Sequence, residues 1–112
     1  MNSNGAQAEE QALQFLLRQG LKLKQRNYVC RLGEIDLILL DGNTLVFAEV
    51  RMRRDGSFGG AAESITPRKR MRLLAAARHY LASHRQLPPC RFDAVLIEGD
   101  GPPRWIKDAF GE

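Results

Sequence analysis

The sequence predicts an α/β fold in which one mixed β-sheet is flanked by helices, so that each apolar face is covered. Three features predict it: an amphipathic stripe near the N-terminus, two β-rich runs joined by a tight turn, and a second amphipathic stripe followed by another β-rich run. The expected order of elements is α-β-β-β-α-β. The 112 residues suffice for one domain, 1–112, with a tail that begins at about residue 100.

The N-terminal part predicts a helix over residues 5–19 and a strand over residues 21–30. The apolar side chains of the helix recur at helical spacing, and Gly20 ends the pattern. These side chains are Ala8, Ala12, Phe15 and Leu16. The strand rests on a weaker alternating pattern in LKLKQRNYVC.

A β-hairpin is predicted next, because the β-rich runs GEIDLILL and TLVFAEVRM are separated only by Asp41-Gly42-Asn43. If Gly42 and Asn43 form a two-residue turn, Asp41 pairs with Thr44 and the numbers of paired residues sum to 85. The ladder then places Asp36 opposite Glu49, and Glu34 opposite Arg51, on one face. The other face is apolar and holds Ile35, Leu37, Leu39, Val46, Ala48 and Val50.

Other registers remain open for this hairpin. A turn centred on Asp41-Gly42 would pair Asp36 with Phe47, and a three-residue loop with a bulge would also shift the partners. Asp36 and Glu49 lie on neighbouring strands in every case. Like charges facing each other destabilise a sheet, but two carboxylates plus retained waters commonly hold Mg²⁺. The pair therefore predicts a site for Mg²⁺ or Mn²⁺.

The Gly-rich segment 53–65 predicts a loop, and a second helix follows from Thr66 to about His84. Thr66 suits the N-cap and Pro67 the first helical position. The residues expected on one apolar face are Leu73, Leu74, Ala77, Tyr80 and Leu81. A strand over residues 90–99 comes after the helix, with a short edge strand at Trp105-Ile106. A helical crossover of this kind is normal for a parallel strand pair.

The charge is unevenly distributed along the chain. The net charge is +4 and the pI about 9.5, yet residues 51–85 contain nine basic and two acidic residues, a local balance of +7. Such clustering favours an anionic partner, most often nucleic acid; a solvated basic face is the alternative. Arg68, Lys69 and Arg70 oppose the dipole of the second helix, and a bound phosphate would offset this conflict. Alternatively, these side chains simply extend into water.

The remaining features indicate a cytoplasmic protein. Cys30 and Cys90 form no metal-binding or redox motif, which suggests reduced, structural thiols. The polar start predicts no signal peptide, and no apolar run is long enough to span a membrane.

Five blocks in the sequence resemble the YraN-like family of uncharacterised bacterial proteins, over about Glu9 to Ile97. They are GEIDLI (33–38), LVFAEVR (45–51), FGGA (58–61), TPRK (66–69) and CRFD (90–93). This family looks like a minimal PD-(D/E)XK nuclease, similar to archaeal Holliday junction resolvases. The resemblance implies a restriction-endonuclease-like core and a metal-dependent endonuclease that acts on DNA, including branched or structured DNA. A non-catalytic nucleic-acid-binding module, a protein-interaction scaffold and a homodimer are further candidates.

The resemblance also implies roles for individual residues. Asp36, Glu49 and Arg51 are the expected catalytic residues, and Asp36 and Glu49 the expected metal ligands, with Glu9 and Glu34 as additional candidates. The basic cluster, rather than the resemblance, predicts the nucleic-acid-binding residues, which are Arg53, Arg54, Arg68, Lys69, Arg70 and Arg72. Arg51 occupies a position where the family usually has lysine. Arginine stays protonated, so it can orient a group or stabilise charge but is unsuited to act as a general base.

Overall fold

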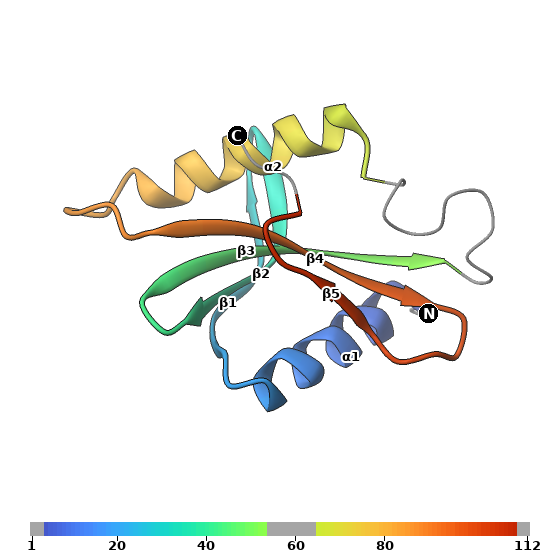
Figure 1. The fold of residues 1–112 in the computed structure, drawn as a ribbon. Coiled ribbons are helices and arrows are strands. Elements are labelled where there is room, and N and C mark those ends of the chain that lie inside the picture. The colour runs from blue at the N-terminus through green and yellow to red at the C-terminus, as the bar shows by residue number, and fades with distance from the viewer. Residues whose placement is uncertain (1–3, 54–64, 110–112) are drawn as a thin grey trace.

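A computed structural model describes residues 4–53 and 65–109, with Asn4 and Arg53 described by their backbone alone. The described residues form, in order, α1 (Asn4–Arg18), β1 (Lys22–Cys30), β2 (Gly33–Asp41), β3 (Thr44–Arg53), α2 (Pro67–Leu81), β4 (Cys90–Glu98) and β5 (Arg104–Ile106). The predicted α-β-β-β-α-β order is confirmed, and β5 is the short edge strand expected at Trp105-Ile106 (Figure 1). Neither described helix has the length and apolar character needed to cross a membrane.

The five strands form one mixed sheet in the order β1-β2-β3-β4-β5. β3 and β4 are parallel, as the crossover through α2 predicts, and the other pairs are antiparallel. α1 and α2 lie on opposite faces of the sheet (Figure 1). The fold is therefore the α/β restriction-endonuclease-like core that was expected.

Each face of the sheet has its own apolar core. The α2 side buries Ile35, Ile38, Leu45, Phe47, Ile65, Leu73, Ala76, Ala77, Phe92, Ala94 and Leu96. The α1 side buries Ala8, Ala12, Leu13, Leu16, Leu21, Leu37, Leu39, Val46, Ala48, Val50, Val95 and Ile97. Burial on both faces explains why β2 and β3 are apolar along most of their length.

Capping and turn-forming residues determine where the two helices begin and end. The Thr66 hydroxyl accepts a hydrogen bond from the Lys69 amide at 3.2 Å, and Pro67 opens α2, as predicted. α2 ends at Leu81, three residues before the expected His84. Gly20, with φ +98°, follows the end of α1.

The C-terminal segment is more integrated than the tail expected from about residue 100. The fully buried Asp93 carboxylate accepts hydrogen bonds from Arg91, the Trp105 indole and the Asp108 amide, each at 2.9 Å. Because every oxygen of this buried charge has a donor, the network fixes β5 to β4 rather than destabilising the core.

The hairpin of β2 and β3 has the predicted register. Asp41 pairs with Thr44, and the pairing continues to Leu37 and Ala48, with every pair summing to 85. The structure therefore excludes the turn centred on Asp41-Gly42. Within the described part of both strands, this ladder stops one step before Asp36 and Glu49.

The predicted alternation is wrong beyond that point, because β2 bends at Asp36. Ile35 packs with Ile38 on the α2 side, although it was expected with Leu37 on the other side. β1 bends with it, since Asn27 has φ +51° between the pairs Arg26–Leu37 and Tyr28–Ile35. The tip of the β1–β2 hairpin therefore rises towards α2 (Figure 1).

The bend also changes the neighbours of the hairpin tip. The β2–β3 ladder ends at Leu37 and Ala48, so the expected pairing of Glu34 with Arg51 is wrong. On its other side Glu34 pairs with Val29 of β1. Gly33 reaches the α2 backbone so closely that a Cβ atom at this position would lie 2.2 Å from the Arg72 carbonyl oxygen. Glycine at position 33 is thus required by this close approach.

Candidate functional site

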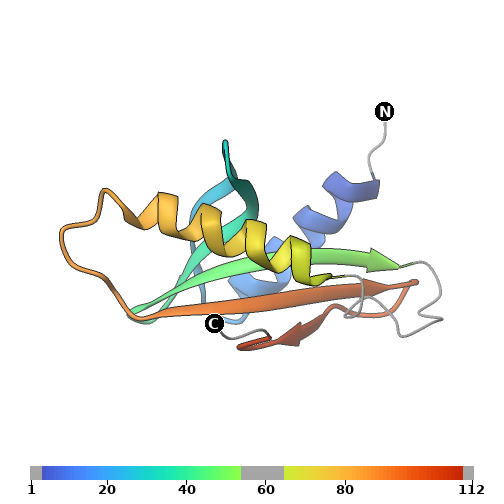
Figure 2. The same ribbon diagram turned by 90° about the horizontal axis from the view of Figure 1, so that it is seen from above.

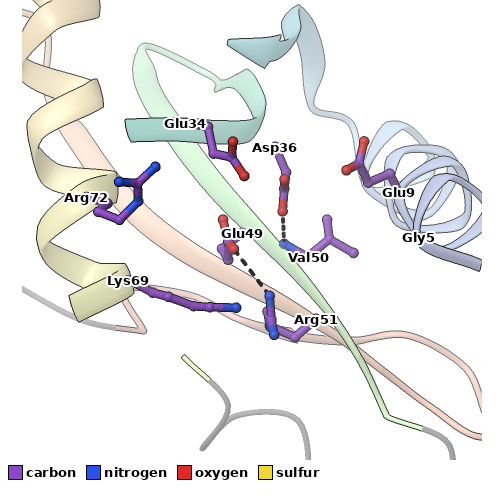
Figure 3. Close-up of a pocket in the computed structure, with 9 residues that line it drawn as sticks. All are labelled: Gly5, Glu9, Glu34, Asp36, Glu49, Val50, Arg51, Lys69 and Arg72. Atoms are coloured by element: carbon purple, nitrogen blue, oxygen red, sulfur yellow. Dashed lines mark hydrogen bonds and ion pairs between the residues drawn. The ribbon is translucent and has the colours of Figure 1, made fainter. Parts of the chain in front are cut away.

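A pocket of about 270 Å³ lies where β2 bends, between the first turns of α1 and α2. It is lined by Gly5, Glu9, Glu34, Asp36, Glu49, Val50, Arg51, Lys69 and Arg72 (Figure 3). Four of these residues are acidic and three are basic. We call it the carboxylate pocket.

Asp36 is held in the pocket by the neighbouring strand. Its Oδ2 atom accepts a hydrogen bond from the Val50 amide at 2.8 Å. The side chain thus takes a position that a backbone carbonyl would have in a regular ladder, directly beyond the last pair, Leu37 and Ala48. Bends and bulges of this kind are known to re-aim side chains at functional sites.

Asp36 and Glu49 are brought together, as expected, although by the bend rather than by direct pairing. The two carboxyl groups lie close enough to share a proton. Burial, followed by the charge of Asp36, raises the pKa of Glu49 to about 8. Burial also raises the pKa of Asp36, although the Val50 amide and Glu49 act in the opposite direction. A pKa of about 8 keeps the Glu49 carboxyl group mostly protonated at neutral pH.

Glu9 and Glu34 flank this pair. Burial and then the charge of Asp36 raise the pKa of Glu9, whose carboxyl group lies within hydrogen-bonding reach of Asn27 and Asp36. Figure 3 shows Glu9 approaching from α1, and Glu34 on the opposite side of Asp36. Within residues 4–53 and 65–109, no three His, Cys, Asp or Glu side chains are arranged to hold a metal ion by themselves.

The central feature is thus a pair of carboxylates with room beside it. Such a pair fits Mg²⁺, which is usually bound through one or two carboxylates and keeps several waters. A divalent cation would also remove the cost of holding two adjacent, mostly buried acids. Glu9 lines the same pocket from α1 and Glu34 lines it from β2, so both carboxylates face the space beside the pair (Figure 3).

Three cations complete the carboxylate pocket. Arg51 Nη1 lies 3.8 Å from Glu49 Oε2, and Figure 3 shows the Lys69 side chain extending towards both residues from the first turn of α2. Arg72, one turn later, points into the same space. Basic groups thus face the carboxylate pair from the α2 side.

The expected nucleic-acid-binding residues differ in their position relative to the carboxylate pocket. Lys69 and Arg72 line the pocket, whereas Arg68 and Arg70 are exposed on α2 outside its lining. Arg54 lies outside the described residues, as does most of the expected Gly-rich loop, and the side chain of Arg53 is not described. The sequence places Lys69 and Arg72 on one helical face, but it does not show that this face meets the carboxylates.

These observations first define a class of protein: a restriction-endonuclease-like α/β fold with a half-buried carboxylate pair beside a basic helix. The chain belongs to the uncharacterised protein family UPF0102, whose profile matches residues 8–97. This membership confirms the resemblance to the YraN-like group.

Relatives align along nearly the whole chain. A UPF0102 protein of Nitrosomonas eutropha is 56% identical over 110 residues, which cover 98% of this chain and 95% of that protein. A UPF0102 protein of Psychromonas ingrahamii is 49% identical over 112 residues, covering 99% and 92%. One from Nitrosococcus oceani is 55% identical over 111 residues, covering 95% and 90%.

Proposed function

We propose that this protein is a metal-dependent endonuclease that hydrolyses phosphodiester bonds in DNA, including branched or structured DNA. The observation that carries the proposal is the half-buried Asp36–Glu49 pair, which shares one pocket with Arg51, Lys69 and Arg72. A purely structural pocket would gain nothing from two adjacent acids with raised pKa values. Perturbed acids in a concave site, beside cations, are typical of catalytic centres.

Asp36 and Glu49 would hold Mg²⁺ or Mn²⁺, and Glu9 would contribute from α1. The bound ion would lower the pKa of a coordinated water and offset charge on the phosphate. The chain itself orients Asp36 through the Val50 amide, so the ligand does not depend on a flexible rotamer. Binding would displace the proton that the pair holds at neutral pH.

The three cations of the pocket would bind the phosphate group. Arg51 is next to Glu49, and as an arginine it is unsuited to act as a general base, so it would orient a phosphate oxygen or the attacking water. Lys69 and Arg72 would contact further phosphate oxygens from α2. These contacts stabilise negative charge that grows in the transition state, which is the larger part of catalysis in phosphoryl-transfer sites.

Arg68 and Arg70 extend the basic surface beyond the pocket along the first turns of α2. Their exposed side chains would contact neighbouring phosphates of the same substrate. Contacts of this type position a nucleic acid without reading its sequence. The protein would therefore select its substrate by the phosphate backbone and the shape of the DNA, and not by its base sequence.

The experiment is a cleavage assay on single-stranded, duplex and four-way-junction DNA, with Mg²⁺, with Mn²⁺ and with EDTA. We expect cleavage that requires metal and is abolished in Asp36→Ala. Glu10→Gln is the matched control, because Glu10 is an exposed acid of α1 next to Glu9. Absence of cleavage on every substrate, by folded protein that binds DNA, would contradict nuclease activity.

One observation favours a second candidate, a nucleic-acid-binding module that has kept the nuclease fold. Arg51 stands where the family usually has lysine, and it lies beside Glu49, one of the two proposed ligands. In that case DNA binding would persist and fall with salt, without cleavage. Arg51→Lys distinguishes the candidates, because gain of cleavage in this variant would identify Arg51 as the cause of inactivity.

A further inference from the structure

A second pocket, of about 580 Å³, lies near the C-terminal end of α2. It is lined by Tyr28, His79, Tyr80, Ala82, Ser83 and His84. Figure 2 shows the β1–β2 hairpin crossing α2, with the first turns of α2 on one side and its last turns on the other. The carboxylate pocket and this second one, which we call the aromatic pocket, therefore flank the hairpin.

The rings of the aromatic pocket hold one another in place. The centroids of Tyr28 and Tyr80 are 5.3 Å apart in an edge-to-face arrangement, and those of Tyr80 and His84 are 5.2 Å apart. The Tyr28 hydroxyl is hydrogen-bonded to Nδ1 of His79. Tyr80 also packs edge-on against the buried Phe47, at 6.0 Å. The pocket is thus anchored to the core and formed in advance.

The same rings are open to solvent. His79 and His84 are exposed, and Tyr28 and Tyr80 are half-buried. Ser83 adds a hydroxyl group to this lining. A wall of aromatic rings with a few hydrogen-bonding groups suits a flat, aromatic, polar-edged ligand, and a nucleobase has these properties.

The aromatic pocket and the carboxylate pocket lie along the same side of α2. Arg72 and His79 are seven residues apart, so they lie on the same side of α2 about two turns apart. Lys69 and His79 are ten residues apart, or about 15 Å along the helix. A stacked strand that rises about 3.4 Å per nucleotide covers this distance in about four to five nucleotides.

The part of the hairpin between the pockets exposes two apolar side chains beside the exposed Arg31. Leu32 and Val29 expose 59% and 69% of their surface near the hairpin tip. Bases of an intact duplex are paired and stacked, so they are not available to enter the aromatic pocket. An unpaired strand that passes the hairpin has free bases, which can contact the hairpin tip and enter the aromatic pocket.

We propose that the aromatic pocket binds an unpaired nucleobase of the strand whose phosphate lies in the carboxylate pocket. The inference rests on the proposed function and narrows it. The substrate is DNA with a single-stranded stretch of a few nucleotides beside the cleaved bond. His84 stacks on the base, Tyr28 and Tyr80 form the wall beside it, and His79 and Ser83 contact its edge.

Binding of an unpaired base can be tested by fluorescence anisotropy in EDTA. The two probes are a labelled duplex that carries a gap of about five nucleotides and an intact labelled duplex. His84→Ala removes one exposed ring, His84→Phe restores a ring, and Gln86→Ala is a neighbouring exposed control. We expect His84→Ala to weaken binding to the gapped DNA about tenfold, the size of one base–aromatic stack, and to leave duplex binding unchanged. His84→Phe and Gln86→Ala should bind as the unsubstituted protein does.

A second measurement reads the contact directly. Gapped DNA with 5-iodouracil in the gap should form a photo-crosslink to Tyr28, His79, Tyr80 or His84, identified by mass spectrometry. Equal affinity for gapped and intact DNA, an unaffected His84→Ala and crosslinks elsewhere would overturn this inference alone. Failure to bind any DNA would overturn the proposed function together with it.

Discussion

The Asp36 carboxylate accepts a hydrogen bond from the Val50 amide at 2.8 Å, at the place where the β2–β3 ladder would otherwise continue. One side chain therefore ends the regular pairing, satisfies a backbone donor of the next strand and faces Glu49. Structure and proposed chemistry depend on the same carboxylate. Substitutions that keep or remove its acceptor atom should separate these two roles.

Asp36→Asn keeps an oxygen that can accept from the Val50 amide, whereas Asp36→Ala removes it. The orphaned amide costs about 1–3 kcal/mol. We therefore expect the free energy of unfolding of Asp36→Asn to exceed that of Asp36→Ala by about 1 kcal/mol or more, as measured by urea denaturation in EDTA. Both variants should lack cleavage. Equal stability of the two variants would show that the hydrogen bond contributes little.

The raised pKa of Glu49 predicts a specific pH dependence of stability. Burial, followed by the charge of Asp36, raises the pKa of this carboxyl group from its usual 4.5 to about 8 in the folded protein. A raised pKa means that the folded state binds the proton more tightly, so this stabilisation is complete below about pH 4.5. It is lost as the pH rises through about 8.

Urea denaturation of the metal-free protein between pH 4.5 and 9 measures this effect. We expect the free energy of unfolding to fall across that range, and the fall to be much smaller in Glu49→Gln. Asp36 acts in the same direction, because its pKa is also raised. Glu10→Gln, which changes an exposed acid, should keep the slope of the original protein. A slope that survives Glu49→Gln would assign the effect to other groups.

Lys69 is expected to act on the reaction, unlike its exposed neighbour Arg68. Lys69→Ala should lower the single-turnover cleavage rate at saturating DNA about a hundredfold, the usual size for loss of one group that stabilises transition-state charge. Arg68→Ala should instead weaken DNA binding and reduce its salt slope by about 1, with the saturated rate unchanged. If Lys69→Ala behaves as Arg68→Ala does, Lys69 serves binding alone.

Gly33 is expected to be essential for the position of α2. A Cβ atom at position 33 would lie 2.2 Å from the Arg72 carbonyl oxygen, a backbone atom that has little freedom to move. Gly33→Ala should destabilise the protein by about 1–3 kcal/mol or more in urea denaturation. Gly101→Ala is the control, since a Cβ atom at position 101 would lie at an ordinary 3.5 Å from the Glu98 carbonyl oxygen. Equal stability of the two variants would contradict the close approach.

The sequence predicts the hairpin well because its register depends on local chemistry. Gly42, with φ +63°, and Asn43 form the two-residue turn, and buried faces on both sides fix the pairs from Asp41–Thr44 to Leu37–Ala48. Asp36 and Glu49 could thus be assigned to one site from the sequence. Their proximity did not depend on knowing the whole fold.

The bend at Asp36 could not be predicted, because it depends on distant parts of the chain. Asn27 takes a positive φ in β1, and Gly33 packs on the α2 backbone, so the alternation is set by tertiary contacts rather than by pattern. The position of α2 also places Lys69 and Arg72 in the lining of the carboxylate pocket, whereas the sequence predicted only a basic surface. The aromatic pocket likewise joins Tyr28 to His79, which are 51 residues apart.

The most direct measurement is a calorimetric titration of Mn²⁺ into the protein, Asp36→Asn, Glu49→Gln and Glu10→Gln, at pH 7 in buffers of different ionisation enthalpy. If Asp36 and Glu49 together hold one divalent cation, the protein and Glu10→Gln bind one Mn²⁺ and release a proton. Asp36→Asn and Glu49→Gln then show no comparable binding. Equal binding by all four proteins would place the metal elsewhere and contradict the proposed site.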